Sequence, residues 1–397
     1  MVQKNHGLGQ RPISYHKKVG DTLKENSITA AELKKINRNR IFKLIYERKE
    51  ISRRDIALAL SLSQPTVTQN LQELEDMGLI DYAGNFQSTG GRKAQAIIPK
   101  TDARITIGIE ISKSYIRILA IDLAGKVLDY EKYIKTFSIE EEYGRNLSYL
   151  ISNMIGHNRL KQEHILGVGL AVAAVFDQQK ECIIKAPSLE VSGYAIENLV
   201  KFIDYPYSID NDANAGAFVE LWEHLQGESR VYLAIGKGVG GCLIRNNEIV
   251  RGVHHRAGEF GHMTLFPNGR MCNCGQKGCL EAYLSIERLS DDLNCQVEDF
   301  FSELAAGNPK HMRIWEEYKQ YLCIGINNIY MAYDEEIVLG GVLSQYLEPY
   351  MQDICHTLAA LNSFEPNGDY LTLTKHHSRV MAVGAALQLV SHFIDGI

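Results

Sequence analysis

The sequence has no apolar run long enough to span a membrane as a helix. The longest run, from Ile165 to Phe176, is interrupted by glycine and falls well short of the ~20 residues that a bilayer requires. The segment from Met1 to Arg11 is polar and lacks the apolar core of a secretory signal peptide. These absences predict a cytoplasmic protein that has no membrane partner.

Cysteine is also scarce, with eight residues in a chain of 397, which excludes the disulfide scaffold of small secreted proteins. In a reducing compartment, clustered cysteines are better interpreted as metal ligands. Three of the eight lie between positions 272 and 279. The other five are isolated and are predicted to be core thiols: Cys182, Cys242, Cys295, Cys323 and Cys355.

The composition that remains is that of an ordinary folded protein, with 45% apolar and 23% charged residues. Because single cores stop growing near ~250–300 residues, we expect two or three domains. Charge is divided unevenly: residues 1–100 hold 17 Lys and Arg against 10 Asp and Glu, a net +7, and the remainder has a net −13. The basic part is therefore the one expected to meet a polyanion such as nucleic acid.

The N-terminal region carries the pattern of three helices. Residues 1–30 are polar and aperiodic, so they are predicted to be poorly ordered. The second helix is expected to begin at Ser52 and the third at Ser63, since both can cap a helix, and Gly78 is expected to end the third. The first helix, over positions 31–48, is predicted to bury one apolar face: Leu33, Ile36, Ile41, Leu44 and Ile45.

The third helix carries uncharged hydrogen-bonding side chains on the outer face of its N-terminal half. Two short helices joined by a tight turn, with such a face on the second, match a helix-turn-helix whose second helix enters the major groove. Side chains of this kind suit the edges of bases. The predicted DNA contacts on this helix are Gln64, Thr66, Thr68 and Gln69.

A predicted hairpin follows, with strands at 79–82 and 94–98 around a tip that contains Arg92 and Lys93. These two side chains are predicted to contact phosphates or to enter a minor groove. Residues 31–98 are thus predicted to form a winged helix-turn-helix DNA-binding domain. A three-helix packing module with a protein-binding hairpin is the alternative, but helix, turn, wing and charge agree on DNA.

From residue 101 to 397, strand patterns alternate with helical ones, which is typical of the α/β class. Strands are predicted at 105–111, 115–122 and 167–176, and a helix at about 140–158. A glycine-rich turn lies at 235–241. This part of the chain, the body, is long enough for two subdomains.

Three motifs occur in the body in a fixed order: Asn-Asp-Ala-Asn-Ala from Asn211, Gly-Glu-x-Gly-His from Gly258, and Cys-x-Cys-Gly-x-x-Gly-Cys-x-Glu from Cys272. With them the chain resembles the ROK family (repressors, open reading frames and kinases), and its winged helix resembles the sugar-sensing repressor branch. The resemblance implies an actin- and hexokinase-like, ribonuclease H-like body in which two subdomains flank a sugar-binding cleft. The first would comprise about 101–225 with the C-terminal helix, and the second about 228–380.

The resemblance also implies which residues contact the sugar. Carboxylate, amide and imidazole groups can accept from and donate to adjacent hydroxyls, so the set is chemically consistent with a sugar ligand. Taken singly, Asp212 would equally suit a helix cap and Glu259 a solvated charge. The implied sugar contacts are Asn211, Asp212, Glu259, His262 and Glu281.

His262, Cys272, Cys274 and Cys279 form a Cys3His set of the kind that binds zinc tetrahedrally. A full protein shell leaves no position for an activated water, so one structural zinc per chain is predicted. Because an imidazole has two nitrogens, His262 can bind zinc through one and face a sugar hydroxyl with the other. Unmetallated buried cysteines and a redox switch are the alternatives.

Two glycine-rich loops of the family's kinases, which hold the phosphates of ATP, are altered here. The first pattern, Asp-x-Gly-x-Thr, reads Glu110 to Ser114, with Ser112 in place of the glycine and Glu110 in place of the aspartate. In the second, Lys237 replaces the hydroxyl residue. These departures argue against the use of ATP, although Asp212, the counterpart of the kinases' general base, is retained.

The primary hypothesis is therefore a repressor of carbohydrate-utilisation genes that binds double-stranded operator DNA as a homodimer or dimer of dimers and responds to a sugar. The alternative is an active ATP-dependent sugar kinase, with DNA binding as a second function. A phosphosugar or a protein partner as the effector is a third hypothesis. The sequence leaves the identity of the sugar and the sign of its effect open.

Overall fold

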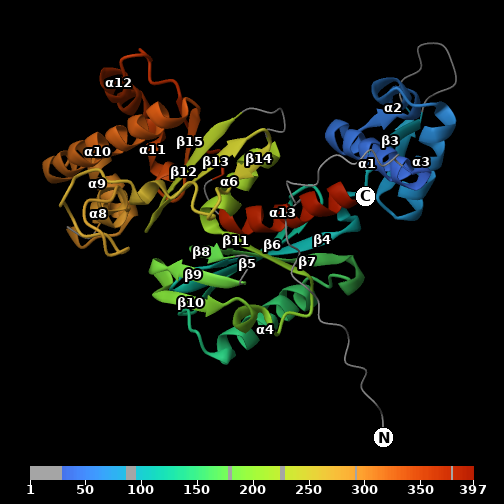
Figure 1. Ribbon diagram of the computed structural model, residues 1–397, viewed down its shortest axis with the longest axis horizontal. Coiled ribbons are helices and arrows are strands. Elements are labelled where there is room, and N and C mark those ends of the chain that lie inside the picture. The colour runs from blue at the N-terminus through green and yellow to red at the C-terminus, as the bar shows by residue number, and fades with distance from the viewer. Residues whose placement is uncertain (1–28, 86–94, 178–180, 224–228, 291–292, 377–378) are drawn as a thin grey trace, which may run out of the picture.

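Figure 1 presents the computed structural model of the chain, which describes residues 29–85, 95–177, 181–223, 229–290, 293–376 and 379–397. The segment 1–28, which falls within the region predicted to be poorly ordered, lies outside these ranges. Among the described helices, none combines the length and apolar character needed to cross a bilayer.

The N-terminal domain is a winged helix. Ser52 and Ser63 accept hydrogen bonds from the backbone N–H groups of Asp55 and Thr66, so the predicted second and third helices begin where expected. A three-stranded sheet in the order β1-β3-β2 lies beside the helices. The elements are α1 (Ala30–Arg48), β1 (Ile51–Ser52), α2 (Arg53–Leu60), α3 (Gln64–Asp76), β2 (Ile80–Asn85) and β3 (Gln95–Pro99).

The predicted buried face of α1 is wrong at its N-terminal end. Leu33 and Ile36 are 51% and 44% exposed, whereas Ile41 and Ile45 are fully buried. The buried residues of α1 begin at Asn37, because the first turns of the helix extend beyond the core that α2, α3 and the sheet form. The apolar periodicity of the sequence therefore extends toward the N-terminus of α1 beyond the part of the helix that is packed against the core.

The first subdomain is built on a five-stranded sheet in the order β11-β7-β4-β5-β6, in which β11, β7 and β4 run parallel. The predicted strand 167–176 is instead two strands, because the chain turns at Ala174 and β8 joins a separate sheet with β9 and β10. The elements are β4 (Ile105–Ile111), β5 (Tyr115–Asp122), β6 (Val127–Ile134), α4 (Glu141–His157), β7 (Ile165–Val172), β8 (Val175–Asp177), β9 (Cys182–Ala186), β10 (Val191–Ala195), α5 (Glu197–Val200), β11 (Tyr207–Asn211) and α6 (Asp212–Glu223).

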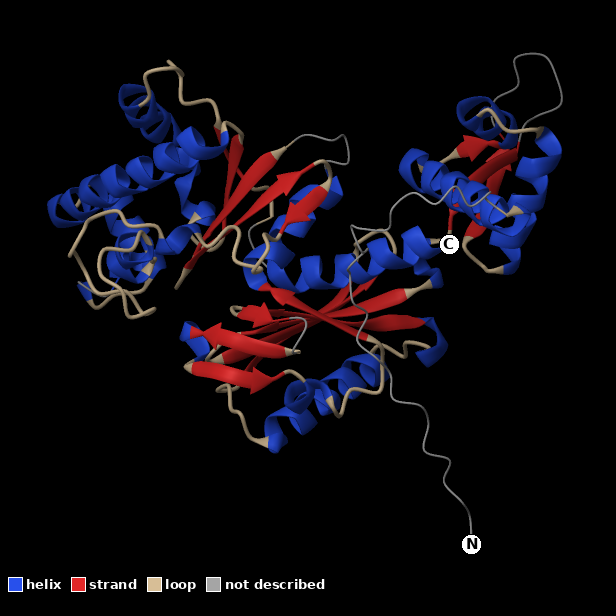
Figure 2. Cartoon of the chain, viewed as in Figure 1, coloured by secondary structure: helices blue, strands red, loops and turns tan. Residues whose placement is uncertain are grey.

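The second subdomain has its own five-stranded sheet, in the order β14-β13-β12-β15-β16, and its own apolar core. Helices cover this sheet, and the longest of them is α10 (Figure 2). The elements are β12 (Arg230–Ile235), β13 (Val239–Arg245), β14 (Glu248–Val250), α7 (Glu281–Leu284), α8 (Glu287–Ser290), α9 (Val297–Ala305), α10 (Pro309–Tyr333), β15 (Glu336–Gly340), α11 (Ser344–Leu347), α12 (Met351–Leu361) and β16 (Leu371–Leu373). Short 3-10 turns connect elements of the body, namely η1 (Thr101–Ala103), η2 (Gln162–His164), η3 (Pro187–Leu189), η4 (Phe260–His262) and η6 (Glu348–Tyr350).

The last helix, α13 (Val380–Gly396), returns to the first subdomain and lies between its sheet and α6 (Figure 1). Its approach to both neighbours requires glycine. A Cβ on Gly169 of β7 would overlap the carbonyl oxygen of Ala385, and one on Gly384 would overlap that of Ala215 in α6. At these two glycines the backbones of three elements thus meet directly.

The far end of α13 contacts the winged helix. Lys43 of α1 forms an ion pair of 2.6 Å with Asp395, and the side-chain amide of Asn39 donates to the carbonyl of Ile394. The Tyr46 hydroxyl donates to the carbonyl of Leu123 at 2.6 Å. A single helix therefore links the middle of the body to the N-terminal domain.

Candidate functional sites

The predicted DNA-reading face lies on the surface of α3. Gln64, Thr68 and Gln69 are exposed, and Thr66 is half-buried because its hydroxyl contacts Ser63 at 2.8 Å. The Thr68 hydroxyl donates to the carbonyl of Gln64 at 2.9 Å and accepts from Arg53 at 3.2 Å. Within the described chain, the side-chain amides of Gln64 and Gln69 form no hydrogen bond, which leaves them available to a ligand. Arg92 and Lys93 lie outside the described residues.

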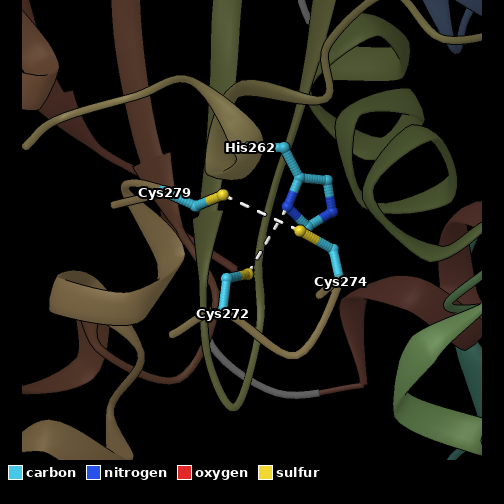
Figure 3. Close-up of side chains that lie close together, drawn as sticks. All are labelled: His262, Cys272, Cys274 and Cys279. Carbon is cyan, nitrogen blue, oxygen red and sulfur yellow. Dashed lines mark hydrogen bonds between the residues drawn. The ribbon is translucent and has the colours of Figure 1, made fainter. Parts of the chain in front are cut away.

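Figure 3 shows the side chains of His262, Cys272, Cys274 and Cys279 converging on one point. Their ligand atoms all lie within 4.8 Å of one another, so this group could hold a metal ion. The sulfurs of Cys274 and Cys279 are 3.7 Å apart, close to the ~3.8 Å that two thiolates 2.3 Å from a tetrahedral zinc require. Burial raises the pKa of the Cys272 thiol, and a bound cation would offset this by favouring the thiolate.

The loop that carries the cysteines is held by its own backbone. Cys272 N–H donates to the carbonyl of Gln276 at 2.8 Å, and Gly275 N–H donates to that of Cys272 at 2.9 Å. Gly278 has a φ of +83°, and a Cβ there would overlap the carbonyl oxygen of Phe266. The tight turns that bring three closely spaced sulfurs together thus depend on a residue without a side chain.

The two ring nitrogens of His262 face different groups. Nδ1 lies 3.8 Å from the Cys272 sulfur, and Nε2 lies 3.8 Å from a carboxylate oxygen of Glu259. The ring can therefore bind a metal through Nδ1 while Nε2 stays on the side of the carboxylates.

Asn211 and Asp212 lie where β11 ends and α6 begins. The Asn211 side-chain oxygen accepts from the N–H groups of Ala213 and Asn214, at 2.9 and 3.2 Å, and its amide donates to Ala174 at 3.2 Å. One oxygen of Asp212 accepts from Ala213 N–H at 2.9 Å. The structure thus fixes both side chains by backbone bonds at a helix start.

Carboxylates gather around Asp212. Burial is the largest effect on this group, and the neighbouring charges of Glu110 and Glu259 add to it, so that the pKa of Asp212 rises to about 7. Burial likewise raises the pKa of Glu259, with a further contribution from Glu281. The pKa values of Asp212 and Glu259 therefore respond to neighbouring carboxylates of the predicted sugar site.

Glu281 points toward the turn between β12 and β13. One of its oxygens accepts from Val239 N–H at 3.0 Å, and the other lies 3.4 Å from the Cys272 sulfur. A Cβ on Gly238 would lie 3.1 Å from the carboxylate, so the glycine there leaves it room. Glu281 thus connects the cysteine loop to the second glycine-rich turn.

The first altered phosphate loop holds an ion pair. Glu110, buried in β4, accepts from Arg117 of β5 with both oxygens at 2.9 Å and from the Tyr115 hydroxyl at 2.9 Å. In the second loop, the Lys237 side chain is 75% exposed and its nitrogen lies 3.9 Å from Glu287. The carboxylate that replaces the kinases' aspartate is therefore occupied by cationic and phenolic partners.

The sequence did not reveal a buried network around Asp210, next to the predicted sugar contacts. Arg251, which follows β14, binds both carboxylate oxygens at 2.6 and 2.7 Å, and Gln388 of α13 and Asn214 of α6 donate at 2.9 and 3.1 Å. Burial opposes ionisation, but these partners outweigh it and hold the pKa of Asp210 below its ordinary value. The available signal in the sequence was an acidic residue directly before the Asn-Asp-Ala-Asn-Ala motif.

One direct bond joins β9 to the cysteine loop. The Lys185 ammonium donates to the carbonyl of Cys274 at 2.9 Å. This bond connects the first subdomain's small sheet to the second subdomain.

Comparison with known proteins places these features in a family context. A model described as the ROK family matches residues 106–391, and one described as winged helix-turn-helix DNA-binding matches residues 35–81. The xylose repressor of Bacillus subtilis (strain 168) is 27% identical to this chain over 382 residues, which cover 92% of this chain and 97% of that protein. A putative xylose repressor of Caldicellulosiruptor sp. (strain Rt8B.4) is 28% identical over 340 residues, covering 80% and 85% respectively.

A solved structure has the same fold over nearly the full length. It is the crystal structure of a ROK family transcriptional regulator, a homologue of the Escherichia coli Mlc protein. The TM-score is 0.74 and the identity 23%, with 92% of this chain and 97% of that chain covered. The arrangement of a winged helix before a two-sheet body is thus shared with that regulator.

Proposed function

Because the chain belongs to the ROK family, and because a helix-turn-helix precedes the ROK body, we propose that it is a transcriptional repressor that binds operator DNA and responds to a sugar. The observation that carries the proposal is the presence, in one chain, of an exposed polar face on α3 and a gathered set of carboxylates in the body. The names of the two relatives make xylose the first effector to test. Operator binding implies that the protein acts in the cytoplasm.

The DNA contacts follow from the winged helix. α3 would enter the major groove, where Gln64 and Gln69 can bond base edges and Thr66 and Thr68 can contact bases or phosphates. Arg92 and Lys93 would contact the backbone or the minor groove. A homodimer, or a dimer of dimers, would present two such helices to a palindromic site.

The sugar contacts would be Asn211, Asp212, Glu259, His262 and Glu281. The charge of Glu259 helps to raise the pKa of Asp212, that of Glu281 helps to raise the pKa of Glu259, and His262 Nε2 lies 3.8 Å from a Glu259 oxygen, so these side chains lie near one another. Several acceptors close together suit a ligand with adjacent hydroxyls, whose O–H groups donate.

We infer that the metal is zinc and that it is structural. Three thiolates and one imidazole match zinc's preferences, and four protein ligands complete a tetrahedron. When bound, the ion would supply positional restraint rather than chemistry. Cys272, Cys274 and Cys279 would hold the loop in place. His262 would keep its Nε2 turned toward the carboxylates, and Glu281, two residues after Cys279, would be positioned by the end of the loop.

The path from sugar to DNA would run through α13. Gln388 bonds Asp210, one residue from the proposed sugar contacts, and the far end of the same helix bonds α1. A sugar that favours one arrangement of the two subdomains would move α13 and so change the spacing of the DNA-binding domains in a dimer. Only differential affinity for two arrangements can transmit the signal.

A sugar kinase is the second candidate function, and one observation favours it. The pKa of Asp212, about 7, is that of an effective general base at neutral pH. Against it, both oxygens of the Glu110 carboxylate, which stands in place of the kinases' aspartate, are bound by Arg117, and Ser112 replaces the glycine of the same loop. We therefore place the repressor first.

The test uses the full-length protein. Its preferred duplex is selected from random DNA, and the affinity is then measured by fluorescence anisotropy with and without xylose and a panel of other free sugars. Sugar binding is followed by thermal shift, with Asp212→Asn as the test variant and Asp204→Asn, an exposed aspartate, as the matched control. Sugar-dependent release of DNA, lost in Asp212→Asn alone, is expected.

Two outcomes would overturn the proposal. ATP-dependent phosphorylation of a sugar that Asp212→Asn abolishes would establish the kinase. Tight binding to one duplex that no free sugar alters would instead point to a phosphosugar or protein effector.

A further inference from the structure

A cavity of about 500 Å³ lies where the winged helix meets the body. The winged helix contributes the end of α3 and Gly78, and the body contributes the segments 102–105 and 159–164, with Lys100 in the connection between them. Volumes of this size are typical of small-molecule sites. The lining contains none of the proposed sugar contacts and no residue of the cysteine loop.

The lining of this cavity is strongly basic. It contains Lys100, Arg104, Arg159 and Lys161, together with His164. Within the described chain, the side chains of Lys100, Arg159 and Lys161 form no ion pair or hydrogen bond, and all three are exposed. With two carboxylates against these four cations, the lining has a net charge of +2 when His164 is neutral, and an anion placed among the cations that form no ion pair would relieve their mutual repulsion.

Arg104 is the one cation of the set whose position is fixed. Its guanidinium donates to the carbonyl of Ala103 at 2.7 Å and lies over the ring of Phe393 at 5.7 Å. A guanidinium held in this way still has unused N–H donors, in the fork geometry that suits phosphate.

Two carboxylates, Asp76 and Asp102, share the lining with these cations. They would repel a bare polyanion, but they can accept from the hydroxyl groups of a ligand. A site that offers cations and acceptors together fits a molecule that carries a phosphate at one end and hydroxyls at the other.

We propose that this cavity binds the phosphate ester of a small hydroxylated molecule, such as a sugar phosphate. DNA is a poorer occupant because the cavity lies at the C-terminal end of α3. The residues proposed to read bases are at the other end, where Gln64 and Asp76 are separated by ~18 Å at 1.5 Å per residue. A ligand here would contact both domains, and by mass action it would stabilise the arrangement in which they form the cavity.

Binding is tested by calorimetry on the full-length protein at constant ionic strength, with glucose 6-phosphate, inorganic phosphate and glucose as the probes. The test variant is Lys100→Gln/Lys161→Gln, and the control is Lys310→Gln/Arg313→Gln, which removes two exposed charges from α10. Unchanged circular dichroism and melting show that both variants fold. We expect glucose 6-phosphate to bind, glucose not to bind through this site, and the test variant alone to lose at least tenfold in affinity.

The inference does not depend on the proposed sugar site, and Asp212→Asn separates the two. Binding of glucose 6-phosphate that survives in Asp212→Asn supports the cavity, whereas binding lost there assigns the ligand to the carboxylates and overturns the proposal. Inorganic phosphate that binds as tightly as the ester, with the same loss in the test variant, supports the site but makes free phosphate its ligand.

Three further results would refute the proposal. They are the absence of binding by either phosphate compound, equal affinity in the test and control variants, and a uniform loss of duplex affinity in the test variant without any binding of phosphate compounds. The last result would make these lysines contacts to the DNA backbone.

Discussion

The two halves of the proposed sugar site are held in position by different means. Asn211 and Asp212 lie at the junction of a buried strand and a helix, and both bond the backbone at the start of α6. Glu259, His262 and Glu281 lie in or beside a loop region with little regular structure, next to the cysteine cluster. Backbone hydrogen bonds at the start of α6 are enough to position the first half. The second half lies on a loop, which requires a further restraint to hold its side chains in place.

The buried partners of each half show the same contrast. Behind the first, Asp210 is satisfied by Arg251, Gln388 and Asn214, so its charge is fully paired within the protein. Behind the second, the ligand atoms of three cysteines and one histidine lie within 4.8 Å of one another, an arrangement that suits the ligands of a single ion. The protein's own hydrogen bonds thus hold the first half rigid for sugar recognition. On our proposal, the second half depends on a bound metal for the same rigidity.

The largest expected effect comes from breaking the network of the first half. Arg251→Met leaves Asp210 as a buried charge without its main partner, and we expect the body to lose roughly 3–5 kcal/mol of unfolding free energy. Denaturant unfolding followed by circular dichroism measures it. Adding Asp210→Asn to Arg251→Met should recover much of the lost unfolding free energy. If Arg251→Met alone loses less than about 1 kcal/mol, solvent reaches the Asp210 carboxylate.

Next in size is removal of a proposed metal ligand from the second half. Cys274→Ser should lower bound zinc and weaken sugar binding by about 10–100-fold, since His262 and Glu281 lose their positioning. Metal content and sugar affinity are measured on the same preparation, with Cys295→Ser, an isolated cysteine, as the control. Zinc loss with unchanged sugar affinity would uncouple the loop from the site.

A smaller effect, with a defined pH dependence, is expected at Asp212. Because its pKa in the folded protein is raised to about 7 from 3.8, its contribution to stability is present below pH 3.8 and is lost as the pH rises through 7. Without sugar, Asp212→Asn should therefore be more stable than the native chain at pH 8, by roughly 1–2 kcal/mol, and the difference should shrink toward pH 5. Thermal melts from pH 5 to 8 measure this. Parallel pH profiles for the two proteins would contradict the raised pKa.

The smallest effect should come from the bond that connects the two subdomains. Lys185 is exposed, so Lys185→Gln, which removes its bond to the carbonyl of Cys274, should change sugar affinity by less than about threefold. Titration calorimetry with the sugar identified by the screen checks it. A tenfold loss would mean that this contact, and not the metal loop alone, positions the second half.

Local features of the fold could be read from the sequence because their signals are local. The caps at Ser52 and Ser63, and strands β4 and β5, depend on neighbours in the chain and were predicted where they occur. The exposure of Leu33 was not predictable in this way, because burial of α1 depends on where the packed core of the domain ends.

For the candidate sites, the motifs indicated which residues gather but not what holds them. Asp210 bonds Arg251, which lies 41 positions away in the sequence, and Gln388, which lies 178 positions away. No local sequence pattern could therefore pair these residues. The basic cavity has the same origin, since its lining comes from two domains. Only the tertiary arrangement shows that Glu110, one of the residues that depart from the kinase pattern, is bound to Arg117.

The glycine contacts of α13 have a consequence for motion. At Gly169 and Gly384 the backbone of α13 touches those of β7 and α6 directly, so no side chain separates the helix from its neighbours at these two points. A residue with a side chain at either position would push α13 away from β7 or α6, because its Cβ would overlap a backbone carbonyl. Because α13 is one continuous helix from Gln388 to the residues that contact α1, a shift of its Asp210 end would also displace its contacts with the winged helix.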